Sequence, residues 1–155
     1  MDISSVLNVN NIKLNMVAKN KIDAIEELTD LLVQNGSVID KDEFLRDILL
    51  REELGPTGFD NYIALPHGES SAVHHTALAI GRTQHDITWD AEFGVDVRCI
   101  ILYAIRLDEQ DATSLRLLAH VSSTLAFEDI TEQLLKENDP RHIVAIFNTQ
   151  VEFNH

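Results

Sequence analysis

Two stretches in the first third of the chain have the apolar spacing of helices. Over residues 22–32, apolar side chains recur every three to four positions, which predicts one buried helix face. Asn20 is placed to cap the start of this helix, and Asn35 with the glycine after it to end it. A second helix is predicted to begin after Asp40, whose carboxylate can accept a hydrogen bond from the first turn, and to carry Arg51 in its last turn.

Runs of apolar and β-branched residues predict the strands. The longest run, residues 95–105, is expected to form a central strand buried on both faces, with Cys99 as a small buried apolar residue. His85 lies in a polar segment and is predicted to be an exposed loop residue. Shorter strands are expected within residues 6–16 and over residues 63–65, 76–81 and 87–89.

The last third of the chain predicts three helices. The first begins near Asp111, the second near Asp129, and the third at Asp139, which is followed by a first-turn proline. Residues from about 148 onward are expected to be a loose tail. The side chains predicted on the buried face of the first of these helices are Leu115, Leu118, Ala119, Ser122 and Leu125.

These elements together predict the fold class. A chain of 155 residues with 45% hydrophobic residues is long enough to bury the core of one domain. We therefore expect a single α/β domain over residues 1–155, with a mixed parallel and antiparallel central sheet flanked by helices on both faces.

The charge of the chain limits its partners. Asp and Glu total 26 against 12 Lys and Arg, a formal net charge of −14. A polyanion would be repelled by most of this surface, so nucleic acid and anionic membranes are excluded as partners, and a basic protein is favoured. No apolar run approaches the roughly 20 residues of a membrane span, and the N-terminal residues lack signal-peptide features. With a single cysteine and no disulfide possible within the chain, a cytoplasmic location without membrane insertion is expected.

The candidate chemistry lies between Arg51 and Ser70. His67 follows the predicted strand at residues 63–65 and stands between Pro66 and a glycine, which predicts an imidazole held at a stiff turn. The unperturbed pKa of histidine is about 6.5, so a large fraction is a neutral nucleophile near pH 7. Arg51 and Thr57 are residues of the types that bind phosphoryl oxygens, which favours phosphoryl transfer.

The segments Arg51-Glu-x-x-x-Pro-Thr-Gly and Ile63-Ala-Leu-Pro-His-Gly resemble the fructose/mannitol-type (type 2) EIIA domain of the bacterial sugar phosphotransferase system, the PTS. The resemblance implies that His67 is phosphorylated by the histidine phosphocarrier protein and donates to a cysteine of an EIIB protein or domain. Sugar recognition then belongs to the membrane component EIIC. Arg51 corresponds to the active-site arginine, and phosphoryl-binding contributions are expected from Thr57, Gly68 and Ser114. No metal or other cofactor is implied.

The chain departs from the family at one position. Many members carry a second active-site histidine at the start of the helix after the acidic loop, where this chain has Ser114. The resemblance is therefore closer to the galactitol-type branch. His120 lies six residues further on, about 120° around the helix from Ser114, and is interpreted as a partly buried structural histidine.

Three functions stay open at the level of the sequence. The first is a phosphoryl carrier for the uptake of a sugar or sugar alcohol, such as galactitol. The second is a regulatory EIIA-like protein, in which the phosphorylation state of His67 signals to a kinase, transporter or transcription regulator. The third is an α/β ligand-binding domain in which His67 is only a turn residue.

Overall fold

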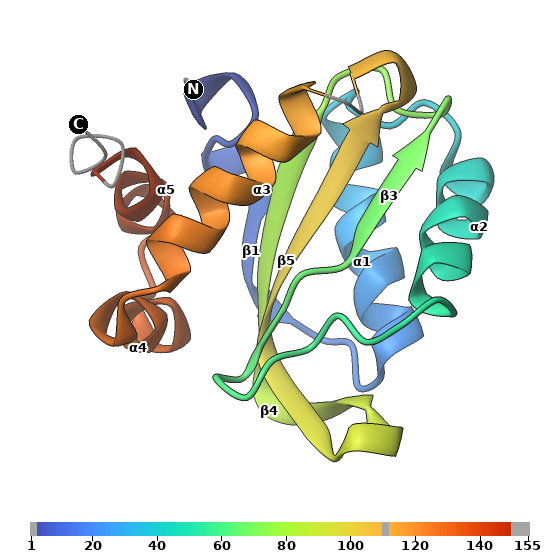
Figure 1. Cartoon of the computed structure of the whole chain (residues 1–155). Helices are drawn as coiled ribbons and strands as arrows, with labels where there is room; N and C mark the ends of the chain where they lie inside the picture. The colour runs from blue at the N-terminus through green and yellow to red at the C-terminus, as the bar shows by residue number, and fades with distance from the viewer. Residues whose placement is uncertain (1–2, 110–111, 150–155) are drawn as a thin grey trace.

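The protein forms three layers, with a central sheet between two sets of helices (Figure 1). The computed structural model describes the backbone of residues 3–109 and 112–149. Helices α1 and α2 cover one face of the sheet, and α3, α4 and α5 cover the other. The predicted α/β class, with helices on both faces of a mixed sheet, is confirmed.

The described residues contain the following elements. The strands are β1 (Ile12–Met16), β2 (Ile63–Ala64), β3 (His67–Ser70), β4 (Ala77–Asp90) and β5 (Val95–Arg106). The helices are α1 (Lys21–Gln34), α2 (Lys41–Glu52), α3 (Ala112–Leu125), α4 (Glu128–Lys136) and α5 (Pro140–Thr149). Short 3-10 turns are η1 (Ile3–Ser5), η2 (Val9–Asn11), η3 (Ala91–Phe93) and η4 (Leu107–Glu109).

The sheet is built around β5, which is buried along most of its length, as its continuous apolar run predicts. Strand β4 is antiparallel to β5 and parallel to β1 on its other side. On the opposite side of β5 lie β2 and β3, both parallel to it and with the same offset of 36 residues. They are two parts of one edge strand, interrupted at Leu65 and Pro66, where proline has no N–H to pair with β5.

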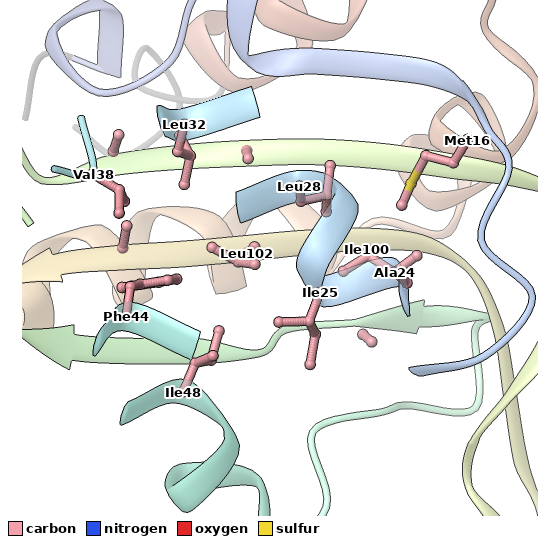
Figure 2. Close-up of a cluster of buried hydrophobic side chains, with 14 of the residues drawn as sticks. Met16, Ala24, Ile25, Leu28, Leu32, Val38, Phe44, Ile48, Ile100 and Leu102 are labelled. Carbon is pink, nitrogen blue, oxygen red and sulfur yellow. The ribbon is translucent and has the colours of Figure 1, made fainter. Parts of the chain in front are cut away.

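One hydrophobic core fills the space between the sheet and the first two helices (Figure 2). Leu28 and Leu32 of α1 and Phe44 and Ile48 of α2 are fully buried there. Figure 2 shows the side chains from these helices turned toward the sheet. This packing holds the end of α2 beside β3, as Figure 1 also shows.

A second core lies between the sheet and the last three helices. Helix α3 contributes Leu117 and Val121, whereas Leu115 is 68% exposed. Of the predicted stripe, Leu118 and Leu125 are partly buried and pack against this core, whereas the prediction was wrong at Leu115, Ala119 and Ser122, which are exposed. Helical spacing alone allows several neighbouring stripes in a helix this apolar, and the sheet selects one of them.

The predicted starts of α1 and α2 are confirmed in detail. The Asn20 side chain accepts a hydrogen bond from the backbone of Asp23, and that of Asp40 accepts one from Glu43. These caps satisfy backbone N–H groups that have no partner within the helix. Arg51 lies in the last turn of α2, as predicted.

Two boundaries differ from the prediction. The segment containing His85 is not a loop but part of β4, which runs unbroken through an exposed polar stretch with irregular register between Arg82 and Ile87. A strand whose side chains are polar and exposed gives no apolar pattern in the sequence, although its backbone still pairs with its neighbours. At the C-terminal end, α5 runs to Thr149, past the predicted start of the tail, and the rest of that tail lies outside the described residues.

Within residues 3–109 and 112–149, no helix has both the length and the apolar character that crossing a bilayer requires.

Gly68 shows how closely β3 approaches α2. A Cβ atom added to Gly68 would lie 3.0 Å from Ile48 Cβ and 3.0 Å from Phe44 Cε1. Ile48 Cβ is attached directly to the backbone of α2, so it cannot rotate out of the way. The absence of a side chain at Gly68 therefore sets the distance between helix and strand.

We predict that Gly68→Ala lowers the free energy of unfolding by about 1–3 kcal/mol, because the added methyl group overpacks the contact with α2. Gly55→Ala is the matched control, since no atom lies within 4 Å of its added Cβ. Urea unfolding of both variants measures the effect. Equal stability of Gly68→Ala and Gly55→Ala would show that α2 shifts to accommodate the added methyl group at little cost.

Candidate active site

His67 is the first residue of β3, on the edge of the sheet. Its neighbour Gly68 faces α2, so the alternation of a strand directs the His67 side chain to the face covered by α3. There it lies edge to face with Tyr103, its partner in register on β5, with ring centroids 6.3 Å apart. The predicted turn at His67 was wrong: a parallel strand pair, rather than a Pro-Gly corner, holds the backbone.

Arg51 reaches His67 from the last turn of α2. Arg51 Nε donates a hydrogen bond to His67 Nε2 at 3.0 Å. The other ring nitrogen, Nδ1, lies 3.5 Å from the carbonyl oxygen of Leu65. Because the guanidinium can only donate, both contacts are consistent with one tautomer, with hydrogen on Nδ1 and a lone pair on Nε2.

The surroundings favour the neutral form of this imidazole. Partial burial of His67 and, next in importance, the Arg51 guanidinium lower its pKa below the ordinary 6.5. The Leu65 carbonyl, Glu69 and Glu52 act in the opposite direction without reversing the shift. The Nε2 lone pair is therefore available as a nucleophile at neutral pH.

His67 and Arg51 are open to solvent through a groove between α2 and β3. Both residues are only partly buried. The groove combines apolar side chains with three carboxylates, and its lining residues are Asp47, Leu50, Arg51, Glu53, Leu54, His67 and Glu69. Phe59 and Tyr62, in the loop before β2, do not line this groove, although they are 50% and 42% exposed. A protein surface with apolar and basic groups fits this combination.

Thr57 is buried, and its side chain is engaged away from His67. Its hydroxyl donates to the Glu52 carboxylate at 2.9 Å and accepts a hydrogen bond from Trp89 Nε1 at 2.8 Å. A hydroxyl has a single hydrogen, so in this arrangement Thr57 has none to give to a phosphoryl oxygen. The observed contacts favour a supporting role, and phosphoryl binding by Thr57 stays a prediction.

The remaining candidates lie in different places. Gly68 is in β3 directly after His67, and its contribution to phosphoryl binding stays a prediction. Ser114 belongs to α3, but its side chain lies outside the described residues. His120 is buried, with Nε2 2.8 Å from the carbonyl oxygen of Phe147, so it joins α3 to α5 as a structural residue.

Two features of the site are not visible in the sequence. One is Tyr103, which only the parallel register of β3 and β5 places beside His67. The other is the pairing of Lys21 with Glu52 and Asp90 below the loop that carries Thr57. These three residues are distant in sequence, and no spacing signals their contact. Cys99 is buried in β5, and burial raises the pKa of its thiol to about 12, in agreement with its expected structural role.

The part of the chain that the structure describes contains no group of three or more His, Cys, Asp or Glu residues arranged to hold a metal ion. His74 and His75 lie next to each other, with ring centroids 4.3 Å apart, but without a third such residue.

Comparison with known families identifies the domain. Residues 5–150 match the family described as phosphoenolpyruvate-dependent sugar phosphotransferase system, EIIA 2. The chain belongs to the PTS EIIA type 2 family. It is thus a domain of the fructose/mannitol EIIA class, whose members carry a phosphoryl group.

Relatives of this EIIA domain differ in their length and their names. It is 30% identical over 148 residues to the fructose-specific EIIABC component of Bacillus subtilis, and this match covers 96% of the chain but only 23% of that protein. Nitrogen regulatory protein IIA-Ntr from Neisseria meningitidis superposes with a TM-score of 0.82 at 26% identity, covering 94% of this chain and 98% of the other.

A chain in the complex of enzyme IIA-mannitol with phosphorylated enzyme IIB-mannitol from Escherichia coli has the same fold. Its TM-score is 0.78 at 24% identity, with 92% of this chain and 97% of the other covered. These relatives do not support the galactitol-type branch that Ser114 suggested.

We predict that the pKa of His67 in the EIIA domain lies below 6.5 and rises in Arg51→Gln, because the positive charge beside Nε2 is removed. The rise stays incomplete, since burial is the larger cause of the shift. An NMR pH titration of the His67 ring measures both values. Arg141 lies in α5 and pairs with Asp139, so Arg141→Gln should leave the titration of His67 unchanged.

The hydroxyl of Tyr103 gives a second prediction. It is buried and has no hydrogen-bond partner among the described residues, and burial raises its pKa above the ordinary value. Tyr103→Phe should therefore increase the free energy of unfolding by about 1 kcal/mol, because an unsatisfied buried donor is removed. Chemical denaturation of Tyr103→Phe and of the exposed control Tyr62→Phe tests this. A loss of stability in Tyr103→Phe alone would reveal a partner for the hydroxyl.

Proposed function

We propose that His67 is the phosphoryl acceptor of this EIIA domain and Arg51 its electrostatic partner. The observation that carries the proposal is the 3.0 Å hydrogen bond from Arg51 Nε to Nε2 of a neutral, partly exposed imidazole. One nitrogen thus combines a lone pair with an adjacent cation, which suits attack on an anionic phosphoryl group. The donor is the histidine phosphocarrier protein, and the acceptor is a cysteine of an EIIB protein or domain.

The transfer follows from the tautomer. The Nε2 lone pair attacks phosphorus and forms an N–P bond, while the bond from phosphorus to the donor's histidine nitrogen breaks and its electron pair returns to that nitrogen. The imidazole of His67 becomes positively charged, and the Leu65 carbonyl opposite Nδ1–H stabilises that charge. The Arg51 guanidinium moves from Nε2 to the phosphoryl oxygens, which keeps the cation next to the transferred charge.

The surface around the site supports protein partners. Asp47, Glu53 and Glu69 line the groove at His67, within a chain of net charge −14, so a donor with a basic face is attracted and oriented. Acceptance by EIIB is supported by the Escherichia coli structure, in which an EIIA domain is complexed with phosphorylated EIIB. In this scheme the sugar contacts the membrane component EIIC, and the EIIA site takes no part in choosing it.

A second candidate function is regulatory. The similarity to nitrogen regulatory protein IIA-Ntr favours it, because that protein shares the fold over nearly the whole chain. The site chemistry would be the same, but phosphorylation of His67 would change the binding of the domain to a target protein, and the phosphoryl group would not be transferred to EIIB. Sugar uptake and regulation therefore differ in the fate of the phosphoryl group.

We predict that His67→Ala abolishes labelling by the phosphorylated histidine phosphocarrier protein. Arg51→Gln should slow labelling about 10²- to 10³-fold, the cost of removing one preorganised group that stabilises the transferred charge. Radiolabelled phosphate on the EIIA domain, followed over time, measures both. Arg141→Gln is the matched control and should be labelled at the wild-type rate.

The same experiment separates the two functions. After the donor is removed, EIIB proteins from the same cell are added to the labelled EIIA domain. Loss of label from His67 to an EIIB cysteine supports the carrier function, whereas label retained on His67 supports regulation. Labelling that persists in His67→Ala would refute the proposed acceptor.

A further inference from the structure

Lys21, Glu52 and Asp90 form an ionic cluster against the loop that leads to His67. The proposed transfer chemistry does not use this cluster. Lys21 Nζ, at the start of α1, lies 2.7 Å from Glu52 Oε1 and 3.1 Å from Asp90 Oδ1. The side chains of Glu52 and Asp90 are 6% and 8% exposed. Burial opposes the charge of Lys21, yet the two carboxylates together raise its pKa. Lys21 therefore keeps its positive charge at neutral pH.

Both carboxylates also hold the loop. Glu52 accepts the hydroxyl hydrogen of Thr57, and Asp90 Oδ2 accepts a hydrogen bond from the backbone N–H of Gly58 at 2.8 Å. Trp89 Nε1 also donates a hydrogen bond to the Thr57 hydroxyl, at 2.8 Å. A Cβ atom on Gly58 would lie within 3.0 Å of Val95 Cγ1 and Asp90 Oδ2, so the backbone is pressed against this support. The loop is thus bonded directly to α2 and β4, and Lys21 of α1 holds both of the carboxylates involved.

From Thr57 the contacts continue to the imidazole. The carbonyl oxygen of Thr57 accepts a hydrogen bond of 2.8 Å from the backbone N–H of Leu65, and the carbonyl of Leu65 faces His67 Nδ1 at 3.5 Å. Glu52 directly follows Arg51 in the last turn of α2. The cluster is therefore connected to both groups that contact the ring. It reaches the Leu65 carbonyl at Nδ1 through Thr57, and the Arg51 guanidinium at Nε2 through the adjacent residue Glu52.

We propose that Glu52 and Thr57 are positioning residues of the phosphoryl-transfer site, which act through Leu65 and Arg51 to hold His67 in the Nδ1–H tautomer. A buried carboxylate paired with Lys21 cannot shift without leaving a charge unpaired, which makes it a stiff anchor. Glu52 holds Thr57 in place, and the hydrogen bond from Leu65 N–H to the Thr57 carbonyl in turn fixes the position of Leu65 and its carbonyl. The effect on transfer rests on the proposed function, whereas the effect on the tautomer does not.

The test compares two substitutions of Thr57. Thr57→Val keeps the shape of the side chain but removes the hydrogen bonds to Glu52 and from Trp89, while Thr57→Ser keeps a hydroxyl. Thr29→Val is the control for a lost buried threonine, because among the described residues the Thr29 hydroxyl bonds only to the Ile25 carbonyl of its own helix. Nitrogen-15 NMR of the His67 ring reports the tautomer, and the initial rate of labelling by the phosphorylated donor reports transfer.

In Thr57→Val we expect the Nδ1–H tautomer to give way to a mixture of tautomers and labelling to slow by up to about a hundredfold, the cost of a small misplacement of a reacting group. Thr57→Ser should restore both readouts, and Thr29→Val should lose stability without changing either. An unchanged tautomer in Thr57→Val would overturn the proposal. A shifted tautomer in a domain whose wild type is never labelled would support the positioning role and refute the phosphoryl-transfer function instead.

Discussion

The contact between Arg51 and His67 depends on two pieces of backbone being held at a set distance. Arg51 is at the end of α2, and His67 is at the start of β3, on the far side of a loop. Phe44 and Ile48 hold the helix against the strand, and the missing side chain of Gly68 allows the close approach. The hydrogen bond at Nε2 is thus a consequence of hydrophobic packing as much as of charge.

The location of His67 on a sheet edge reconciles two requirements. A histidine that accepts a phosphoryl group, the role proposed for His67, must be accessible to a protein partner, yet its ring must be firmly oriented. The parallel ladder to β5 gives the orientation, while the open groove at α2 gives access. Partial burial and Arg51 keep the ring neutral even though the protein as a whole is strongly acidic. Local surroundings therefore outweigh the net charge at this nitrogen.

Thr57 shows that a residue can belong to the motif of a site without touching the reacting group. Its type suits phosphoryl binding, but its hydroxyl contacts Glu52 and Trp89 below the loop. Trp89 comes from the end of β4, far along the chain. The carrier and regulatory functions proposed above would need the same support, because both would begin with phosphorylation of His67.

The local features of this protein were predictable from its amino-acid sequence. Side-chain caps at Asn20 and Asp40 and the buried run of β5 follow from interactions within a few residues, so their patterns are visible in one dimension. The motif likewise identified His67 and Arg51 as a pair. The stripe of α3 that is buried and the continuation of β4 through His85 were not predictable in this way, because the sheet decides them.

The contacts between atoms at the site, in contrast, come from the packing of the whole domain. It placed Tyr103 beside His67 through strand register, turned Thr57 away from the ring, and brought Lys21 to Glu52 and Asp90. Such contacts were not predictable because they join segments separated by dozens of residues. Their geometry depends on how helices and strands pack, and local sequence carries no record of that packing.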